Sequence, residues 1–126
     1  MLQIDLKYIL VIEAARDIRE IIERSLADRV NWQVLLTHSL AQGLALIQTQ
    51  QPDVILLEAN LLQQCDPNTR QQLQTTASDL SIPLIFMAAR IRSMDRLQFK
   101  QFDAAEAIAK PFDPKDLTEA IAKTLN

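Results

Sequence analysis

The chain has 126 residues and a formal net charge of −3, with 13 basic and 16 acidic side chains interspersed along it. This length predicts a single domain with one core over residues 1–126, and the mixed charge argues against a nucleic-acid footprint spread over the surface. One cysteine, Cys65, excludes an internal disulfide and a cysteine-based zinc site, and a single glycine excludes the glycine-rich phosphate loops of nucleotide-binding proteins.

Targeting and membrane signals are not found in the sequence. No apolar run approaches the roughly 20 residues that a membrane-spanning helix requires. The N-terminus has neither the basic start nor the small-residue cleavage site of a signal peptide. We therefore expect a cytoplasmic protein without membrane partners.

The chain begins with a strand and a helix. A run of aliphatic and β-branched residues at 7–12 predicts the strand. The spacing of the apolar residues that follow, with charged residues between them, predicts the helix; they are Ile18, Ile21, Ile22 and Leu26. Residues 32–36 form a second strand candidate. The pattern up to this point is strand, helix, strand.

A second helix and a buried strand follow. Ser39 can cap the helix, Gly43 is a mild weak point inside it, and Pro52 ends it. The aliphatic run at 54–57 is typical of a central parallel strand that is covered on both faces. The stretch at 60–78 is rich in Gln, Asn and Thr and gives the weakest helix signal in the chain.

The last third of the chain repeats the alternation. Residues 82–87 predict a strand with a proline near its start, where the lost backbone donor is tolerable. Apolar residues at helical spacing between 91 and 102 suggest a helix, and residues 107–109 form a short strand. Asp113 and Pro114 then mark a helix start, because a capping carboxylate precedes a proline at the first helical position.

Strands that alternate with helices predict a parallel sheet, because each crossover is right-handed and each helix must bury one apolar stripe. We therefore expect an α/β fold, a doubly wound five-stranded parallel sheet with helices on both faces. In such sheets the functional site lies beyond the carboxyl ends of the strands. Four residues fall at those ends, namely Glu13, Glu58, Ala88 and Lys110.

Three features of the sequence resemble the receiver domain of bacterial two-component response regulators. They are the run Ile9-Leu10-Val11-Ile12-Glu13, the carboxylate Glu58 after an aliphatic run, and Lys110-Pro111-Phe112 after a third short run. The resemblance extends from about residue 7 to residue 125 and implies the flavodoxin-like fold of CheY-like domains, built from βα repeats. It also implies a role in phosphorelay signal transduction.

The resemblance assigns a role to each position at the strand ends. In the family, acidic residues hold Mg²⁺, an aspartate accepts the phosphoryl group, a hydroxyl residue and a lysine contact that group, and an aromatic side chain switches rotamer. Carried over by position, these roles fall to Glu13 with Ala14, to Glu58, to Ala88, to Lys110 beside Pro111, and to Ala107. Only the lysine and its proline match the family pattern.

The departures from the pattern predict a degenerate phospho-acceptor site. Ala14 removes a metal-binding carboxylate, Ala88 removes the hydroxyl, and Ala107 lacks a ring that could switch. Glu58 is one methylene longer than aspartate, and a displacement of about 1 Å can cost about a hundredfold in rate. Glu58 is either a tolerated replacement whose charge is paired with Lys110 or a partial imitation of phospho-aspartate.

The sequence therefore predicts a pseudo-receiver that acts by binding a protein, such as a histidine kinase or another signalling protein, and not as an enzyme. We expect no resident cofactor, no metal ligand set and at most weak binding of Mg²⁺. Two alternatives stay open: a working receiver that is slowly phosphorylated on Glu58 with Mg²⁺, and a flavodoxin-like domain that binds a small molecule at the strand ends. A homodimer is compatible with each of them.

The predicted partner face is built from the helix expected between 91 and 102, the fifth strand and the last helix, and its distinguishing part is the basic segment before the fifth strand. This segment sets four positive charges against one acid in an acidic protein, and not all of its aromatic residues can join one buried stripe. An exposed aromatic side chain among arginines is typical of an interface hot spot. The alternative is a solvated basic face. The predicted partner residues are Arg90, Arg92, Arg96, Phe99 and Lys100.

Overall fold

The computed structural model describes residues 5–89 and 100–125. Its strands are β1 (Lys7–Ile12), β2 (Trp32–Thr37), β3 (Val54–Glu58), β4 (Leu84–Ala88) and β5 (Glu106–Ala109). Its helices are α1 (Arg16–Leu26), α2 (Leu40–Gln50), α3 (Ala59–Gln64), α4 (Pro67–Asp79) and α6 (Pro114–Leu125). Each predicted strand is present, with bounds that differ by at most two residues.

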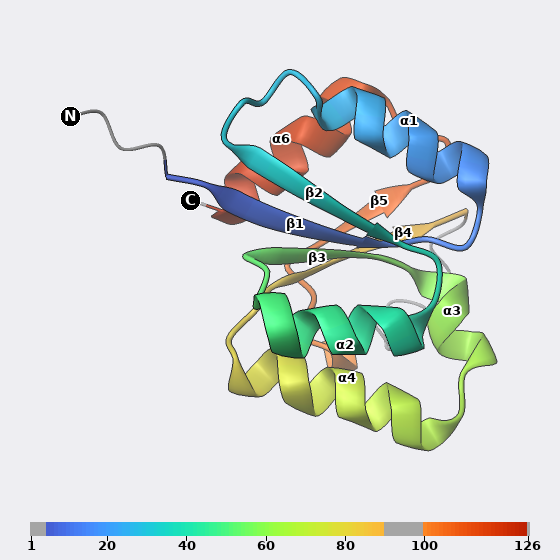
Figure 1. Cartoon of the computed structure of the whole chain (residues 1–126). Coiled ribbons are helices and arrows are strands. Elements are labelled where there is room, and N and C mark those ends of the chain that lie inside the picture. The colour runs from blue at the N-terminus through green and yellow to red at the C-terminus, as the bar shows by residue number, and fades with distance from the viewer. Residues whose placement is uncertain (1–4, 90–99, 126) are drawn as a thin grey trace.

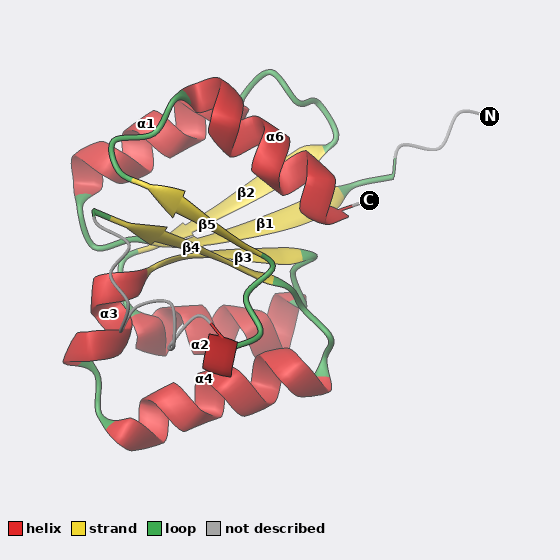
Figure 2. Ribbon diagram, turned by 180° about the vertical axis from the view of Figure 1, so that it is seen from behind, coloured by secondary structure: helices red, strands yellow, loops and turns green. Residues whose placement is uncertain are grey.

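The five strands form one parallel sheet in the order β2-β1-β3-β4-β5. Helices α1 and α6 cover one face of the sheet, and α2, α3 and α4 lie on the other face (Figure 1). Seen from behind, β4 and β5 come to the front and the same two helical layers enclose them (Figure 2). The predicted doubly wound α/β fold with helices on both faces is confirmed.

Each face of the sheet has its own apolar core, because side chains alternate along a strand. In β1, Leu10 and Ile12 pack on the side of α2 and α4, whereas Ile9 and Val11 pack on the side of α1 and α6. All four side chains are buried. The central strands are therefore apolar throughout, as the run at 54–57 predicted, and the polar residues that they carry stand at their ends.

The polar stretch predicted as one weak helix contains two helices. Asp66 separates them: it caps α4 by accepting a hydrogen bond from the Thr69 backbone N–H at 2.7 Å, and Pro67 occupies the first helical position. The same pair of signals starts α6 at Asp113 and Pro114. The start of α4 was thus readable from the sequence by the rule that located α6.

Gly43 is a close-approach position in α2 and not only a weak point. The residue is buried, and a Cβ atom built on it would lie 2.5 Å from the Ile12 Cδ1 atom of β1. The absence of a side chain therefore lets α2 approach the sheet closely. The structure corrects the interpretation of this glycine as a merely tolerated residue.

Most of the helix predicted between residues 91 and 102 lies outside the described residues. Lys100 and Gln101 are helical, and Phe102 is buried against Phe86 with an interplanar angle of 85°. Within the described parts of the chain, no helix is both long enough and apolar enough to cross a membrane.

Candidate functional site

The carboxyl edge of the sheet brings the predicted site residues together. Glu13 follows β1, Glu58 ends the neighbouring strand β3, Ala88 ends β4, and Lys110 follows β5. Backbone hydrogen bonds fix this edge: the Lys110 N–H donates to the Ala88 carbonyl at 2.8 Å, and the Glu13 N–H donates to the Thr37 carbonyl at 3.0 Å. Strand register therefore determines where the charged side chains meet.

The Lys110 ammonium contacts both carboxylates but favours Glu13. Its Nζ atom donates a hydrogen bond to Glu13 Oε1 and lies 3.9 Å from Glu58 Oε1. The Lys110 side chain is 18% exposed, against 2% for Glu13 and 8% for Glu58. Two nearly buried negative charges thus share one partly buried positive charge.

The shorter contact is with Glu13, but Lys110 also lies within ion-pair distance of Glu58, as expected. β4 lies between β3 and β5, so the strands of Glu58 and Lys110 are not neighbours. To reach Glu13, the lysine side chain must extend across the ends of β4, where Ala88 carries only a methyl group, and of β3. Its ammonium group lies closer to Glu13, the more buried of the two carboxylates, than to Glu58.

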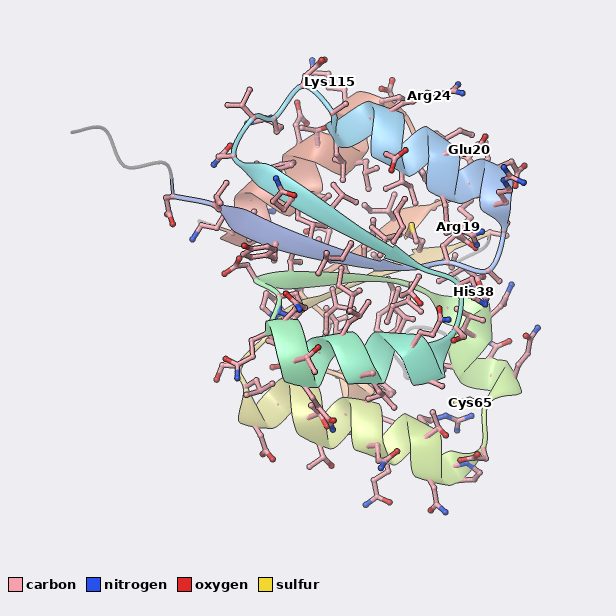
Figure 3. All side chains as sticks on the ribbon, in the orientation of Figure 1. Arg19, Glu20, Arg24, His38, Cys65 and Lys115 are labelled. Carbon is pink, nitrogen blue, oxygen red and sulfur yellow. The ribbon has the colours of Figure 1, made fainter. Side chains whose placement is uncertain are left out.

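Glu13 also organises the loop between β1 and α1. Its Oε2 atom accepts a hydrogen bond from the Ala15 N–H at 3.1 Å. Arg19, in the first turns of α1, donates from one guanidinium nitrogen to the carbonyl oxygens of Glu13 and Ala14, each at 2.8 Å. Figure 3 shows Arg19 at the end of α1 that is nearest the strand ends. Ala14 itself is exposed and offers no ligand atom beyond its backbone.

Arg19 is a site-organising residue that sequence reasoning missed. The signal available was its position: a basic residue in the first turns of a helix is unfavourable for the helix dipole. The cost is offset here because the guanidinium group satisfies two carbonyls of the preceding loop. A basic residue at that position is therefore a hint of a loop contact.

Glu58 is held as the cap of α3. Its Oε1 atom accepts a hydrogen bond from the Asn60 N–H at 3.3 Å, and its side chain is buried. Burial raises the pKa of Glu58 above the ordinary value; Lys110 opposes the rise, and the nearby Glu13 charge adds to it. Desolvation thus outweighs the lysine in setting the direction of the shift.

The three alanine positions have different surroundings. Ala88 is buried at the end of β4, and Ala14 is exposed. Ala107 lies beside Phe86 in the β4–β5 register and is partly buried against the core that α2, α3 and α4 cover. The Lys110–Pro111 peptide bond is cis. The structure thus groups Ala88 with the charged residues and places Ala107 within the last strand.

Of the five predicted partner residues, only Lys100 belongs to the described residues, and it is exposed. Arg90, Arg92, Arg96 and Phe99 lie outside the described residues. The partner face therefore stays a prediction.

The donor set fits a divalent metal poorly. Mg²⁺ requires several well-placed oxygen ligands and loses its water reluctantly. Among the residues that the structure describes, no group of three or more His, Cys, Asp or Glu side chains could hold a metal ion. The two carboxylates at the strand ends already have the Lys110 ammonium as their counter-ion.

A groove of about 570 Å³ lies at the other end of the strands, where β4 and β5 begin. Its buried wall contains Ile82 and Phe102, and Gln74 donates to the Gln101 carbonyl at 2.8 Å beside it. This groove is remote from the strand ends at which a small-molecule site was considered.

Comparison with known proteins identifies the family. The model of the response regulator receiver domain matches residues 9–122. The chain belongs to this family. A role in two-component signalling follows at the level of the family.

Known relatives support this assignment. Response regulator Rre1 from Synechocystis is 27% identical over 117 residues, which cover 93% of this chain and 50% of the relative. The phosphate regulon regulatory protein PhoB from Pseudomonas aeruginosa is 27% identical over 119 residues, covering 94% and 52%. The receiver domain thus spans about half the length of the curated relatives that it matches.

Solved structures confirm the flavodoxin-like receiver fold. A CheY-like receiver domain from Methanospirillum hungatei superposes with a TM-score of 0.81 at 21% identity, covering 95% of this chain and 94% of the other. The chemotaxis protein CheY4 from Vibrio cholerae superposes with a TM-score of 0.80 at 18% identity, covering 95% and 99%. At these identities the likeness concerns the fold alone.

Proposed function

We propose that this receiver domain acts in cytoplasmic two-component signalling by binding a protein partner, and that Glu58 does not serve as an efficient phosphoryl acceptor. The observation that supports the proposal is the Lys110 ammonium group, which hydrogen-bonds Glu13 and lies 3.9 Å from Glu58. In a working receiver this lysine pairs with the phosphoryl group. Here the lysine is already the counter-ion of both strand-end carboxylates.

The chemistry of phosphoryl transfer supports the same proposal. Transfer depends on positioning the acceptor and on neutralising the charge of the transferred group with a hard cation. Glu58 is buried and accepts a backbone hydrogen bond, Ala14 supplies no metal-binding carboxylate, and Ala88 supplies no hydroxyl. The acceptor, the metal site and the hydroxyl contact all differ from what the reaction requires.

Phosphorylation is tested by incubating the protein with acetyl phosphate and Mg²⁺ and measuring the intact mass. We expect no gain of a phosphoryl group by the natural sequence. The matched variant combines Ala14→Asp, Glu58→Asp and Ala88→Thr, which restores the three missing groups, and we expect it to gain one. A gain by the natural sequence that is lost in Glu58→Gln would instead establish the slowly phosphorylated receiver.

Partner binding is expected to be independent of acetyl phosphate, because Ala107 has no aromatic ring that could switch. The predicted partner face is tested by Arg92→Glu with Arg96→Glu, after circular dichroism has shown that the fold persists. We expect this variant to capture fewer proteins from a lysate of the native cell. Undiminished capture by a folded variant would place the partner on another face.

A further inference from the structure

Strand order does not explain why Lys110 donates its hydrogen bond to Glu13. β4 alone separates β5 from β3, whereas both β4 and β3 lie between β5 and β1. The ammonium group nevertheless hydrogen-bonds Glu13 and lies 3.9 Å from Glu58. The two acceptors are the same residue type and both are buried. The preference for the more distant strand therefore has a further cause.

The loop between β1 and α1 lacks the usual means of fixing its shape. Ala15 is the N-cap of α1 and makes no side-chain hydrogen bond to the helix, and alanine is one of the weakest residues at this position. Ala14 and Ala15 are both exposed, so no core holds their methyl groups. The position of this loop therefore depends on hydrogen bonds to its backbone.

Arg19 makes two of these hydrogen bonds. Side chains on a helix lean towards its N-terminus, so an arginine at the fourth position of α1 can reach back over the preceding loop. Its Nη1 atom donates to the carbonyls of Glu13 and Ala14, each at 2.8 Å. The Glu13 N–H donates in turn to the Thr37 carbonyl at 3.0 Å. Both polar atoms of the Glu13 backbone are thus held.

A fixed backbone also directs the Glu13 carboxylate. Its Oε2 atom accepts from the Ala15 N–H at 3.1 Å, which leaves Oε1 for the Lys110 ammonium group. The Glu58 oxygen that lies 3.9 Å from the ammonium group already accepts from the Asn60 N–H at 3.3 Å. Glu13 is therefore the better-placed acceptor for as long as its loop keeps this shape.

We propose that Arg19 is a positioning residue that selects Glu13 as the hydrogen-bond partner of Lys110. By holding the two carbonyls before α1, the guanidinium group keeps the Glu13 carboxylate within reach of the ammonium group. Without these hydrogen bonds the loop relaxes, and Lys110 pairs with Glu58, whose strand is the nearer one. The proposal does not depend on whether Glu58 accepts a phosphoryl group, so the acetyl phosphate experiment and the test of Arg19 can fail independently.

Arg16 provides a matched control for the charge of Arg19. It lies in the same region of α1, but its side chain is 84% exposed and its Nε atom is 3.3 Å from Glu20 Oε1. Arg16→Gln and Arg19→Gln each remove one guanidinium group from the start of the helix. Only Arg19→Gln removes the hydrogen bonds to the loop carbonyls.

Double-mutant cycles in urea unfolding measure the pairing of Lys110. One cycle combines Lys110→Met with Glu13→Gln, and the other combines it with Glu58→Gln. In the natural sequence we expect the larger coupling energy with Glu13. We expect the order to reverse in the Arg19→Gln background and to stay unchanged in the Arg16→Gln background.

The order of the two coupling energies separates positioning from a general structural role. Arg19→Gln is expected to fold, which circular dichroism checks, and Arg19→Met, which keeps an apolar stem, replaces it if it does not. A loss of stability that leaves Glu13 as the more strongly coupled partner would overturn the proposal. A reversed order in Arg16→Gln would also overturn it, because the charge of the helix start would then decide the pairing.

Nuclear magnetic resonance identifies the partner of Lys110 directly. A scalar coupling across the hydrogen bond joins the lysine ¹⁵Nζ nucleus to the ¹³Cδ nucleus of the carboxylate that accepts from it. We expect this coupling to be with Glu13 in the natural sequence and in Arg16→Gln, and with Glu58 in Arg19→Gln. A coupling that stays with Glu13 in Arg19→Gln would contradict the proposal.

Discussion

Lys110 donates its hydrogen bond to Glu13, across the ends of β4 and β3, and lies 3.9 Å from Glu58. One ammonium group therefore balances two nearly buried carboxylates at the carboxyl ends of the strands. This arrangement makes the lysine a structural counter-ion. The behaviour of the site under mutation, pH and added metal follows from this role.

The first prediction concerns the energetic coupling of Lys110 with Glu13. Lys110→Met leaves both buried carboxylates without their cation and should lower the free energy of unfolding by about 3 kcal/mol. Glu13→Gln leaves a lysine that is partly exposed and near Glu58, and should cost about 1 kcal/mol. The double variant should lose less than the sum, by about 1 kcal/mol, when urea unfolding is followed by circular dichroism.

The same cycle with Glu58 in place of Glu13 is the control. Because the Lys110–Glu58 contact is long and has no hydrogen bond, we expect a smaller coupling energy in that cycle. A larger coupling with Glu58 than with Glu13 would show that the lysine belongs to the acceptor position in solution.

The second prediction concerns pH. Burial raises the pKa of Glu58 above 4.5, its ordinary value, so in the window between the two values the folded protein binds the proton more readily than the unfolded chain. Stability should therefore fall as pH rises through this window. Glu58→Gln removes the penalty of the buried charge. In urea unfolding, the free energy of unfolding of this variant should equal that of the natural sequence in acid. The difference in its favour should grow as pH rises past 4.5 and then level off.

Asp66→Asn provides a comparison of opposite sign. The Thr69 N–H holds the pKa of Asp66 below 3.8, its ordinary value. The stabilisation from this carboxylate is present above 3.8 and is lost as pH falls through the lowered pKa. The disadvantage of Asp66→Asn should therefore shrink in acid. A Glu58→Gln profile that followed the same course would contradict the desolvation argument.

The fold was predictable because local signals agree with tertiary packing in most of the chain. The aliphatic runs at 7–12 and 54–57 become buried parallel strands, and the Asp113-Pro114 start opens α6. The polar stretch around Asp66 was harder, since its helices bury few side chains and periodicity depends on apolar residues. There the capping signal was the more informative one.

The contents of the site and the Glu58–Lys110 ion pair were predictable, but the closer contact of Lys110 with Glu13 was not. Strand-end position and family resemblance place Glu13, Glu58, Ala88 and Lys110 at one edge, as found. Which carboxylate takes the lysine depends on strand order and on how far a side chain reaches, and neither can be read from linear spacing. The role of Arg19 was not predicted for a related reason. Its partners are backbone carbonyls, which every residue carries, so no residue type in the sequence indicates them.

The third prediction concerns Gly43. Alanine is a better helix former than glycine by about 1 kcal/mol, so Gly43→Ala in an open helix would be stabilising. Here the added methyl group would lie 2.5 Å from Ile12 Cδ1 in the core, and the isoleucine would have to move. We expect a net loss of about 1–2 kcal/mol in urea unfolding. Ala45→Gly, on the exposed side of the same helix, tests the helix propensity alone.

The fourth prediction concerns Mg²⁺. The natural sequence should bind the ion weakly, because Glu13 and Glu58 already face an ammonium group and Ala14 supplies no carboxylate. Ala14→Asp adds a hard oxygen ligand at an exposed position beside Glu13, where it need not displace Lys110. Isothermal titration calorimetry should therefore show tighter binding by Ala14→Asp than by the natural sequence, and tighter still when Lys110→Met is added.

Ala15→Asp, at the next position, is the matched control for added negative charge and should change the affinity less. Tight binding by the natural sequence would mean that the metal displaces Lys110 from the two carboxylates, and the interpretation of Lys110 as a fixed counter-ion would be wrong.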